Sequence, residues 1–231
     1  MQKTILLIGG SYGIGASIAE KLKDSHQIII ASRSNDNIPK DIIHLTFDVL
    51  KDDITSLELP EKIDGLVYCP GSINLKPFKM MSPDNFNEDM ELNFNSLIRV
   101  VHGLLPKLKN PEQASLVFFS TVAVKVGMPF HTSVAASKGA IEGFAKALAA
   151  EYAPKFRVNV IAPSLTDTPL ASRLLNSDSK KEMMAKRHPL KKVGTTEDIA
   201  AMAAFLLNDE SKWITGQIFG VDGGLSTLNI N

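Results

Sequence analysis

Three glycines near the amino terminus form the clearest chemical pattern of the chain. They follow the apolar run Ile5-Leu6-Leu7-Ile8 with the spacing G-x-x-x-G-x-G. Glycines at this spacing let the chain turn tightly, so that backbone N–H groups approach a pyrophosphate at the positive end of the following helix. The pattern predicts a dinucleotide site. The residues of this loop that we expect to contact the cofactor are Gly9, Ser11, Tyr12, Gly13, Ile14 and Gly15.

The same loop admits a second interpretation. Gly9 to Gly13 also reads G-x-S-x-G, the nucleophile elbow of serine hydrolases, with Ser11 as the nucleophile. An elbow normally follows several strands, whereas eight residues precede Gly9, and the last histidine, His188, lies in a segment rich in lysine and arginine. The elbow also leaves Gly15 without a role. We favour the nucleotide site and keep a serine hydrolase as an alternative.

The end of the second expected strand indicates which dinucleotide is bound. An acid about 20 residues after the glycine loop would hold the ribose hydroxyls of NAD. This chain has Ser32-Arg33-Ser34 there instead. A guanidinium and two hydroxyls suit a 2′-phosphate, so the sequence predicts NADP(H). Asp48, after the third expected strand, is a candidate acceptor for the adenine amino group.

Alternating strands and helices must position these residues. The apolar runs of strand length are Thr4–Ile8, Gln27–Ala31, Ile43–Phe47, Gly65–Tyr68, Ser115–Phe119, Val158–Ile161 and Gln217–Val221. The segments with helical periodicity are Gly13–Lys23, Asn85–Lys109, Ser133–Tyr152 and Thr195–Asn208. This βαβα order predicts an α/β fold, a Rossmann-type doubly wound parallel sheet of about seven strands with right-handed crossovers. Without a repeat or a linker, residues 1–231 are expected to form a single domain.

Composition excludes several classes of protein. The 25 Lys and Arg residues balance 25 Asp and Glu residues, which argues against a nucleic-acid-binding or anionic-membrane surface. The longest apolar stretch, Ala200–Leu207, is far shorter than the roughly 20 residues that span a bilayer. A single cysteine, Cys69, excludes an intramolecular disulfide, and the histidines have no metal-ligand spacing. We therefore expect a cytoplasmic protein without a metal, a nucleic-acid partner or a membrane contact.

Further motifs extend along nearly the whole chain. They are Asp48-Val49, Glu91-Leu92-Asn93-Phe94, Ser120-Thr121, Ala135-Ala136-Ser137-Lys138, Asn159-Val160-Ile161-Ala162-Pro163 and Thr168-Pro169-Leu170. The most specific stretch runs from Pro189-Leu190 through Glu197-Asp198-Ile199-Ala200 and Ile214-Thr215-Gly216-Gln217 to Val221-Asp222-Gly223-Gly224. With the glycine loop, these motifs resemble the short-chain dehydrogenase/reductase family, particularly its 3-oxoacyl-carrier-protein reductase-like branch. The resemblance implies hydride transfer between a nicotinamide cofactor and a small carbonyl or alcohol substrate.

The resemblance also implies catalytic roles and reveals one departure. The family uses an Asn-Ser-Tyr-Lys set, in which the tyrosine is the general acid and the lysine lowers its pKa and holds the nicotinamide ribose. Asn93 and Lys138 match the asparagine and the lysine, and Thr121 keeps a hydroxyl at the serine position. Val134 occupies the tyrosine position, on the same helix face as Lys138.

Valine cannot donate a proton, so the resemblance implies an altered proton donor. His131, just before the helix, has a side chain suited to acid–base work near neutral pH. The other candidates are Thr121 and a water held by Asn93 and Lys138. A catalytically impaired member that binds NADP(H) as a sensor or scaffold is the main alternative.

The resemblance adds further expectations about binding and assembly. The additional cofactor contacts are Val49, Gly71, Lys138, Pro163, Thr166 and Thr168. The segment Pro163–Pro189 is expected to be a lid, with Thr168 donating to the nicotinamide carboxamide. A homotetramer or homodimer would form through the helix Ser133–Tyr152 and the segment Asn85–Lys109. Two smaller departures are Cys69-Pro70-Gly71 in place of Asn-Ala-Gly, and Pro163-Ser164 in place of Pro-Gly.

Overall fold

The computed structural model describes residues 2–36 and 38–229 and contains a seven-stranded parallel sheet of order β3-β2-β1-β4-β5-β6-β7. The strands are β1 (Thr4–Ile8), β2 (Gln27–Ser32), β3 (Ile43–Thr46), β4 (Gly65–Tyr68), β5 (Ala114–Phe119), β6 (Phe156–Pro163) and β7 (Ile218–Val221). The order reverses between β1 and β4, the position at which doubly wound folds bind ligands. The predicted fold class is therefore confirmed.

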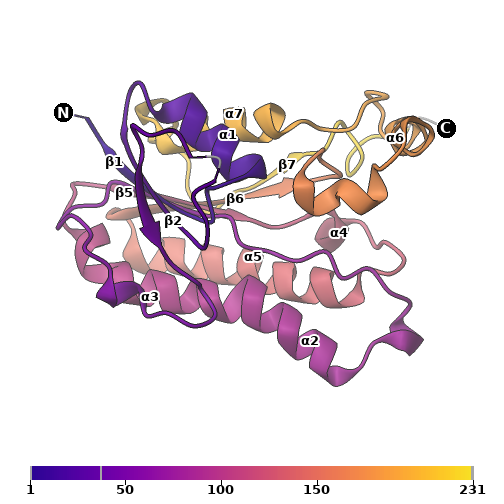
Figure 1. The fold of residues 1–231 in the computed structure, drawn as a ribbon, viewed down its shortest axis with the longest axis horizontal. Coiled ribbons are helices and arrows are strands. Elements are labelled where there is room, and N and C mark those ends of the chain that lie inside the picture. The colour runs from indigo at the N-terminus through magenta and orange to yellow at the C-terminus, as the bar shows by residue number, and fades with distance from the viewer. Residues whose placement is uncertain (1, 37, 230–231) are drawn as a thin grey trace.

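Helices cover both faces of this sheet (Figure 1). On one face lie α1 (Gly13–Leu22) and α7 (Thr196–Leu207), and on the other lie α2 (Pro83–Met90), α3 (Ser96–Lys109) and α5 (Thr132–Tyr152). The short helices α4 (Val122–Lys125) and α6 (Asp178–Lys186) lie toward the end of the molecule where the carboxyl terminus is seen. No helix in residues 2–36 and 38–229 is long and apolar enough to cross a membrane.

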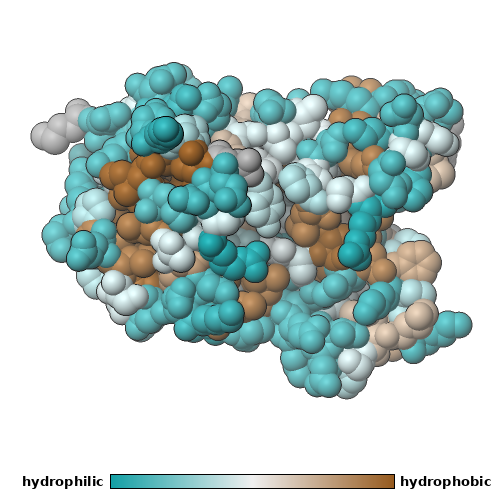
Figure 2. Space-filling model, in the orientation of Figure 1, coloured by the Kyte–Doolittle hydropathy of each residue, from teal (hydrophilic) through white to brown (hydrophobic). Residues whose placement is uncertain are grey.

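Strand β1 explains why the strand sequences are continuously apolar. All five of its residues are buried. Leu6 and Ile8 belong to the core cluster beneath α3 and α5, whereas Ile5 and Leu7 belong to the cluster beneath α1 and α7. A strand covered on both faces needs apolar side chains at every position, which removes the alternation typical of half-exposed strands. On the surface in Figure 2, apolar residues still emerge between hydrophilic ones in the middle of the molecule.

The structure differs most from the expected elements in the segment after β4 and in the expected lid. The predicted helix Asn85–Lys109 begins at Pro83, where Ser82 and Asn85 form a capping box, and a π-helical turn at Glu91–Asn95 interrupts it. The expected lid, Pro163–Pro189, is partly helical, because it contains the 3-10 helix Pro169–Leu174 and helix α6. Helix α6 is polar on nearly all sides and has no buried residue, so hydrophobic periodicity does not reveal it.

Candidate active site

A cleft of about 250 Å³ opens where β1, β2 and β4 end. Its lining includes thirteen residues that the sequence predicted as cofactor contacts: Gly9, Ser11, Tyr12, Gly13, Ile14, Gly15, Ser32, Arg33, Ser34, Asp48, Val49, Gly71 and Thr168. The sequence did not predict the mainly apolar remainder, which is Ala31, Phe47, Leu50, Cys69, Pro70, Leu92 and Leu170. The cleft therefore joins backbone-rich glycine turns to an apolar wall, a combination suited to a nucleotide.

The glycine loop needs glycine for geometric reasons. Gly9 has φ +78° and Gly13 has φ +60°, a conformation that side chains with a Cβ rarely adopt. A Cβ on Gly15 would lie 2.7 Å from the Gly9 carbonyl oxygen and 2.8 Å from the Gly10 Cα. The loop and the start of α1 therefore pack too closely for any larger residue at position 15. This role for Gly15 is the one that the hydrolase interpretation lacked.

His188 contacts a different serine from the one the hydrolase alternative requires. Its Nε2 lies 2.8 Å from Ser164 Oγ, and its Nδ1 lies 3.0 Å from the Met184 carbonyl oxygen. Both ring nitrogens are thus engaged by other groups. Within residues 2–36 and 38–229, no hydrogen bond joins Ser11 to a histidine. The geometry gives no support to a hydrolase that uses Ser11.

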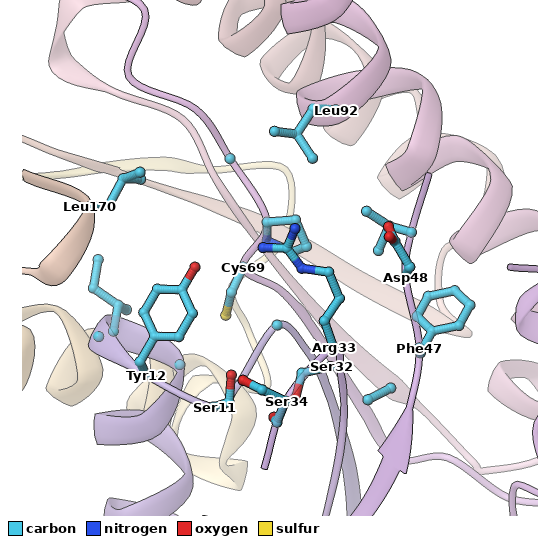
Figure 3. A pocket seen from close by; sticks show the side chains of 18 of the residues that line it. Ser11, Tyr12, Ser32, Arg33, Ser34, Phe47, Asp48, Cys69, Leu92 and Leu170 are labelled. Atoms are coloured by element: carbon cyan, nitrogen blue, oxygen red, sulfur yellow. Dashed lines mark hydrogen bonds between the residues drawn. The ribbon is translucent and has the colours of Figure 1, made fainter. Parts of the chain in front are cut away.

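The end of β2 presents a cation to the cleft. Figure 3 shows the Arg33 guanidinium and the Tyr12 ring pointing toward the same hollow from two sides. The Ser32 hydroxyl donates to the Ser34 carbonyl oxygen at 2.8 Å and lies 3.1 Å from His44 Nε2, so its proton is engaged within the chain. The groups left to meet a phosphate are the Arg33 guanidinium and the Ser34 hydroxyl. The contact with His44 was not foreseen, because no motif links it to position 32.

Asp48 has one carboxylate oxygen engaged at the far side of the cleft. Its Oδ1 accepts the Leu50 backbone N–H at 3.1 Å, and its Oδ2 lies 3.6 Å from Lys51 Nζ. The side chain thus closes a turn directly after β3. The weakly held Oδ2 is the atom that could accept from an adenine amino group.

Helix α5 carries the candidate lysine on its inner face. Val134 is 6% exposed and Lys138 is 8% exposed, and Ile141 farther along the same face is also buried. A Cβ on Gly71 would lie 3.1 Å from Lys138 Nζ and 3.2 Å from Asn93 Oδ1, so both atoms border the cleft wall at Gly71. Burial lowers the pKa of Lys138 to about 8, against the opposing effects of Cys69 and Asp89.

Asn93 is held in place by the π-helical turn and by its amide. The side chain is fully buried. The two protons of its Nδ2 are shared among three acceptors: the Asp89 carbonyl oxygen and Ser72 Oγ, both at 2.9 Å, and Ser137 Oγ at 3.1 Å. Its Oδ1 accepts the Ser72 backbone N–H at 3.2 Å. π-helical turns are frequent at functional sites, and here the turn directs the amide toward α5.

None of the expected catalytic residues is part of the cleft lining, although Asn93 and Lys138 border it at Gly71. Thr121 Oγ1 accepts the Ala123 N–H at 3.3 Å and caps α4, which leaves its own proton free to be donated. His131 precedes α5, and its Nδ1 lies 2.7 Å from the Pro129 carbonyl oxygen. Neither residue borders the cleft that holds the glycine loop.

Of the cofactor contacts expected at or near the segment Pro163–Pro189, some line the cleft and others do not. Pro163 and Thr166 are absent from the cleft lining, and the buried Thr166 donates to the Ser164 carbonyl oxygen at 3.0 Å. Thr168 Oγ1 accepts the Ala171 N–H at 3.2 Å. Thr168 also lies over the glycine loop, 3.8 Å from the position of a Cβ on Gly13. The start of the expected lid segment therefore borders the cleft beside the glycine loop.

Cys69 occupies a strand end, as expected. It is half-buried, and its Sγ lies 3.2 Å from the position of a Cβ on Gly15. Burial raises the pKa of the thiol to about 12, so the group is neutral at physiological pH. Its role in this structure is to pack against the glycine loop.

Comparison with known proteins decides the family. A family model described as "Enoyl-(Acyl carrier protein) reductase" matches residues 9–226. The 3-oxoacyl-[acyl-carrier-protein] reductase FabG of Chlamydia muridarum is 31% identical to this chain over 246 residues, which cover 98% of each protein. The chain belongs to the short-chain dehydrogenase/reductase family. It is thus a member of a family of oxidoreductases, as its motifs predicted.

Solved structures of this family have the same architecture. The aldohexose dehydrogenase of Thermoplasma acidophilum has a TM-score of 0.91 at 26% identity, covering 100% of this chain and 97% of its own. The structure of ElxO with NADP bound has a TM-score of 0.90 at 25% identity, covering 99% of this chain and 100% of its own. The sheet at whose edge the cleft lies is therefore shared with both of these solved structures.

Proposed function

We propose that this protein is an NADP(H)-dependent oxidoreductase of a small carbonyl or alcohol substrate that works without the tyrosine acid. One observation carries the proposal. Lys138 Nζ and Asn93 Oδ1 meet at Gly71, on the wall of the same cleft into which Arg33 projects, while Val134 stands one helical turn before the lysine. A family relative with NADP bound supports the choice of cofactor.

The cofactor site fits NADP(H) at both of its ends. The glycines of the loop leave room for a pyrophosphate to come close to the backbone, so that N–H groups at the start of α1 can bind it. Arg33 would pair with the 2′-phosphate, and Lys138 would hold the nicotinamide ribose. When bound, the nicotinamide supplies or accepts the hydride. Thr168, above the glycine loop, is the expected donor to the carboxamide.

The proton would come from a water held by Lys138 and Asn93. With a pKa of about 8, the Lys138 ammonium is mostly protonated at neutral pH and close to the range in which proton transfer is efficient. Thr121, with a free hydroxyl proton, would donate to the substrate oxygen. Thr121 and His131 both lie outside the cleft lining, and His131 is the less favoured donor because its Nδ1 is engaged with the Pro129 carbonyl oxygen.

The absence of the tyrosine also favours a second candidate function. A protein that keeps the cofactor cleft but lacks the acid would bind NADP(H) as a sensor or scaffold. The two functions differ in turnover alone. A panel of ketones, aldehydes and 3-oxoacyl thioesters with NADPH separates them: consumption of NADPH that requires substrate supports the oxidoreductase, and none with any member supports the sensor.

A homodimer or homotetramer is part of the proposal. The outer side of α5 carries small residues, of which Ala136, Gly143, Ala147 and Ala150 are exposed. A Cβ on Gly143 would meet nothing within 4 Å, so another helix can approach closely there. Sedimentation at micromolar concentration tests this assembly, and a monomer would contradict it.

A further inference from the structure

A buried carboxylate stands behind the candidate catalytic residues, and no motif pointed to it. Asp89, near the end of α2, is 1% exposed. Its Oδ1 accepts the Ser72 hydroxyl at 2.5 Å and the Asn74 amide at 2.8 Å, and its Oδ2 accepts the Ser133 hydroxyl. Three donors from two other segments thus converge on one charged group. Buried carboxylates are rare unless they are paired or fully hydrogen-bonded.

Asp89 acts on Asn93 through Ser72. A serine hydroxyl has one proton, and Ser72 gives it to the Asp89 carboxylate. The Ser72 oxygen is thereby left as an acceptor, and Asn93 Nδ2 donates to it at 2.9 Å. The Ser72 N–H completes the pair by donating to Asn93 Oδ1. The carboxylate therefore reinforces, through Ser72, the backbone contacts that point the Asn93 amide oxygen toward Gly71 and Lys138 Nζ.

Asp89 also supplies negative charge opposite the lysine. Two titratable groups raise the pKa of Lys138 against burial, namely Cys69 and Asp89. The Cys69 thiol is neutral at physiological pH because its own pKa is raised to about 12. Asp89, held behind Asn93 by the hydrogen-bond network, is thus the carboxylate whose charge favours the Lys138 ammonium. The network places this charge behind Asn93, away from the cleft lining.

We propose that Asp89 is a positioning residue of this active site, whose carboxylate acts through Ser72 to hold the Asn93 amide beside Lys138 in the absence of a tyrosine. The inference rests on the proposed function, because Asn93 and Lys138 act there. Ser133, which immediately precedes Val134, holds the same carboxylate. Ser133, the neighbour of Val134, is thus hydrogen-bonded to the same Asp89 carboxylate that acts on Asn93 through Ser72.

The pH dependence of NADPH binding tests the charge. The charged Lys138 holds the ribose, so affinity for NADPH should fall as pH rises through about 8. In Asp89→Asn the midpoint of this fall should move to lower pH, because a negative charge that favours the ammonium is lost. Glu88→Gln, which removes an exposed charge from the same helix, should leave the midpoint unchanged. A folded Asp89→Asn protein with the wild-type midpoint would overturn the proposal.

Ser72→Ala separates orientation from charge. The variant keeps the Asp89 carboxylate and removes its link to Asn93. We expect a wild-type midpoint for NADPH binding and a lower kcat, with KM for NADPH unchanged. An unchanged kcat in an active wild-type background would overturn the orienting role.

An unfolding cycle tests the same pair without any cofactor. In the wild-type background, Asp89→Asn should lower the urea concentration at the midpoint of unfolding. In a Lys138→Met background the carboxylate has already lost its counter-charge, so the same substitution should lower the midpoint less or raise it. Should Asp89→Asn fail to fold alone, recovery of folded protein in the double variant supports the pairing, and no recovery contradicts it. Equal losses in both backgrounds would also contradict it. Failure of the wild type to bind NADPH would refute the proposed function, whereas this cycle would still decide the role of Asp89.

Discussion

The glycine-loop cleft and the region around α5 solve different problems within one fold. In the cleft, the Arg33 guanidinium and the Tyr12 ring project into open space. Positive φ angles at Gly9 and Gly13 and close packing at Gly15 make three glycines necessary there. Around α5, the polar groups satisfy one another: Asp89, Ser72 and Asn93 form a closed network beneath Lys138. In the proposed function, cofactor recognition therefore depends on backbone shape and one cation, whereas proton chemistry depends on a network of individual side chains.

The largest expected effect comes from restoring the missing acid. Val134→Tyr should raise carbonyl turnover by about 10²–10⁴-fold, because general acid catalysis contributes that much, while NADPH affinity stays the same. Val134 is buried, so overpacking should cost about 1–3 kcal/mol of stability. Val134→Phe is the matched control, since it adds a ring without a hydroxyl. Equal rates for the two variants would show that the phenol is not the missing part.

The cleft is tested by removing its cation. Arg33→Ala should weaken NADPH binding by about 10- to 100-fold and leave NADH binding nearly unchanged, because a charge-assisted contact contributes about 1.5–3 kcal/mol. Lys21→Ala, on the exposed end of α1, is the control for a general loss of positive charge. Calorimetry in which Arg33→Ala keeps the NADPH preference would remove the basis for the cofactor assignment.

The two regions should differ in their response to pH. Lys138, with its pKa lowered to about 8, loses its charge between about pH 7 and 9, so NADPH affinity should fall several-fold across this range. The 2′-phosphate contact with Arg33 should persist, since arginine stays charged. In Lys138→Met the affinity should be low and independent of pH between 7 and 9. Fluorescence titration of NADPH measures both, and the same slope in the two proteins would contradict the assignment of Lys138.

The smallest expected effect concerns the histidine before α5. His131 lies outside the cleft lining, and its Nδ1 is engaged with the Pro129 carbonyl oxygen. His131→Ala should therefore change kcat by less than about two-fold, within the range of neutral surface substitutions. A loss of about 10²-fold or more, the contribution of a general acid, would make His131 the donor.

The fold and the cofactor loop could be predicted from the sequence because both depend on local residue patterns. Buried strands such as β1 require uninterrupted apolar residues, and the turn at Gly9 requires glycine. The hydrogen-bond network around Asp89 could not be predicted from local patterns. Ser72 and Ser133 reach Asp89 from 17 and 44 residues away in the chain, and isolated serines have no distinguishing pattern. Contacts of this kind arise only once the fold brings the segments together.

Other features of the structure that the sequence did not predict also lack a sequence pattern. Helix α6 is polar and buries no residue, so periodicity does not indicate it. The Ser164–His188 and Ser32–His44 contacts join residues that no motif relates. Each is a side-chain contact whose partners become neighbours only through the arrangement of the loops at the carboxyl ends of the strands.

A crystal structure of the wild type with NADP⁺ tests the central claim most directly. The account predicts the 2′-phosphate at Arg33, the pyrophosphate on the glycine loop, Lys138 Nζ on the ribose hydroxyls, and the Val134 methyl groups facing the nicotinamide where a phenol would stand. A water between Lys138 Nζ and Asn93 Oδ1 should complete the site. An empty cleft at saturating NADP⁺, or an acidic side chain within hydrogen-bond reach of the substrate position beside nicotinamide C4, would contradict it.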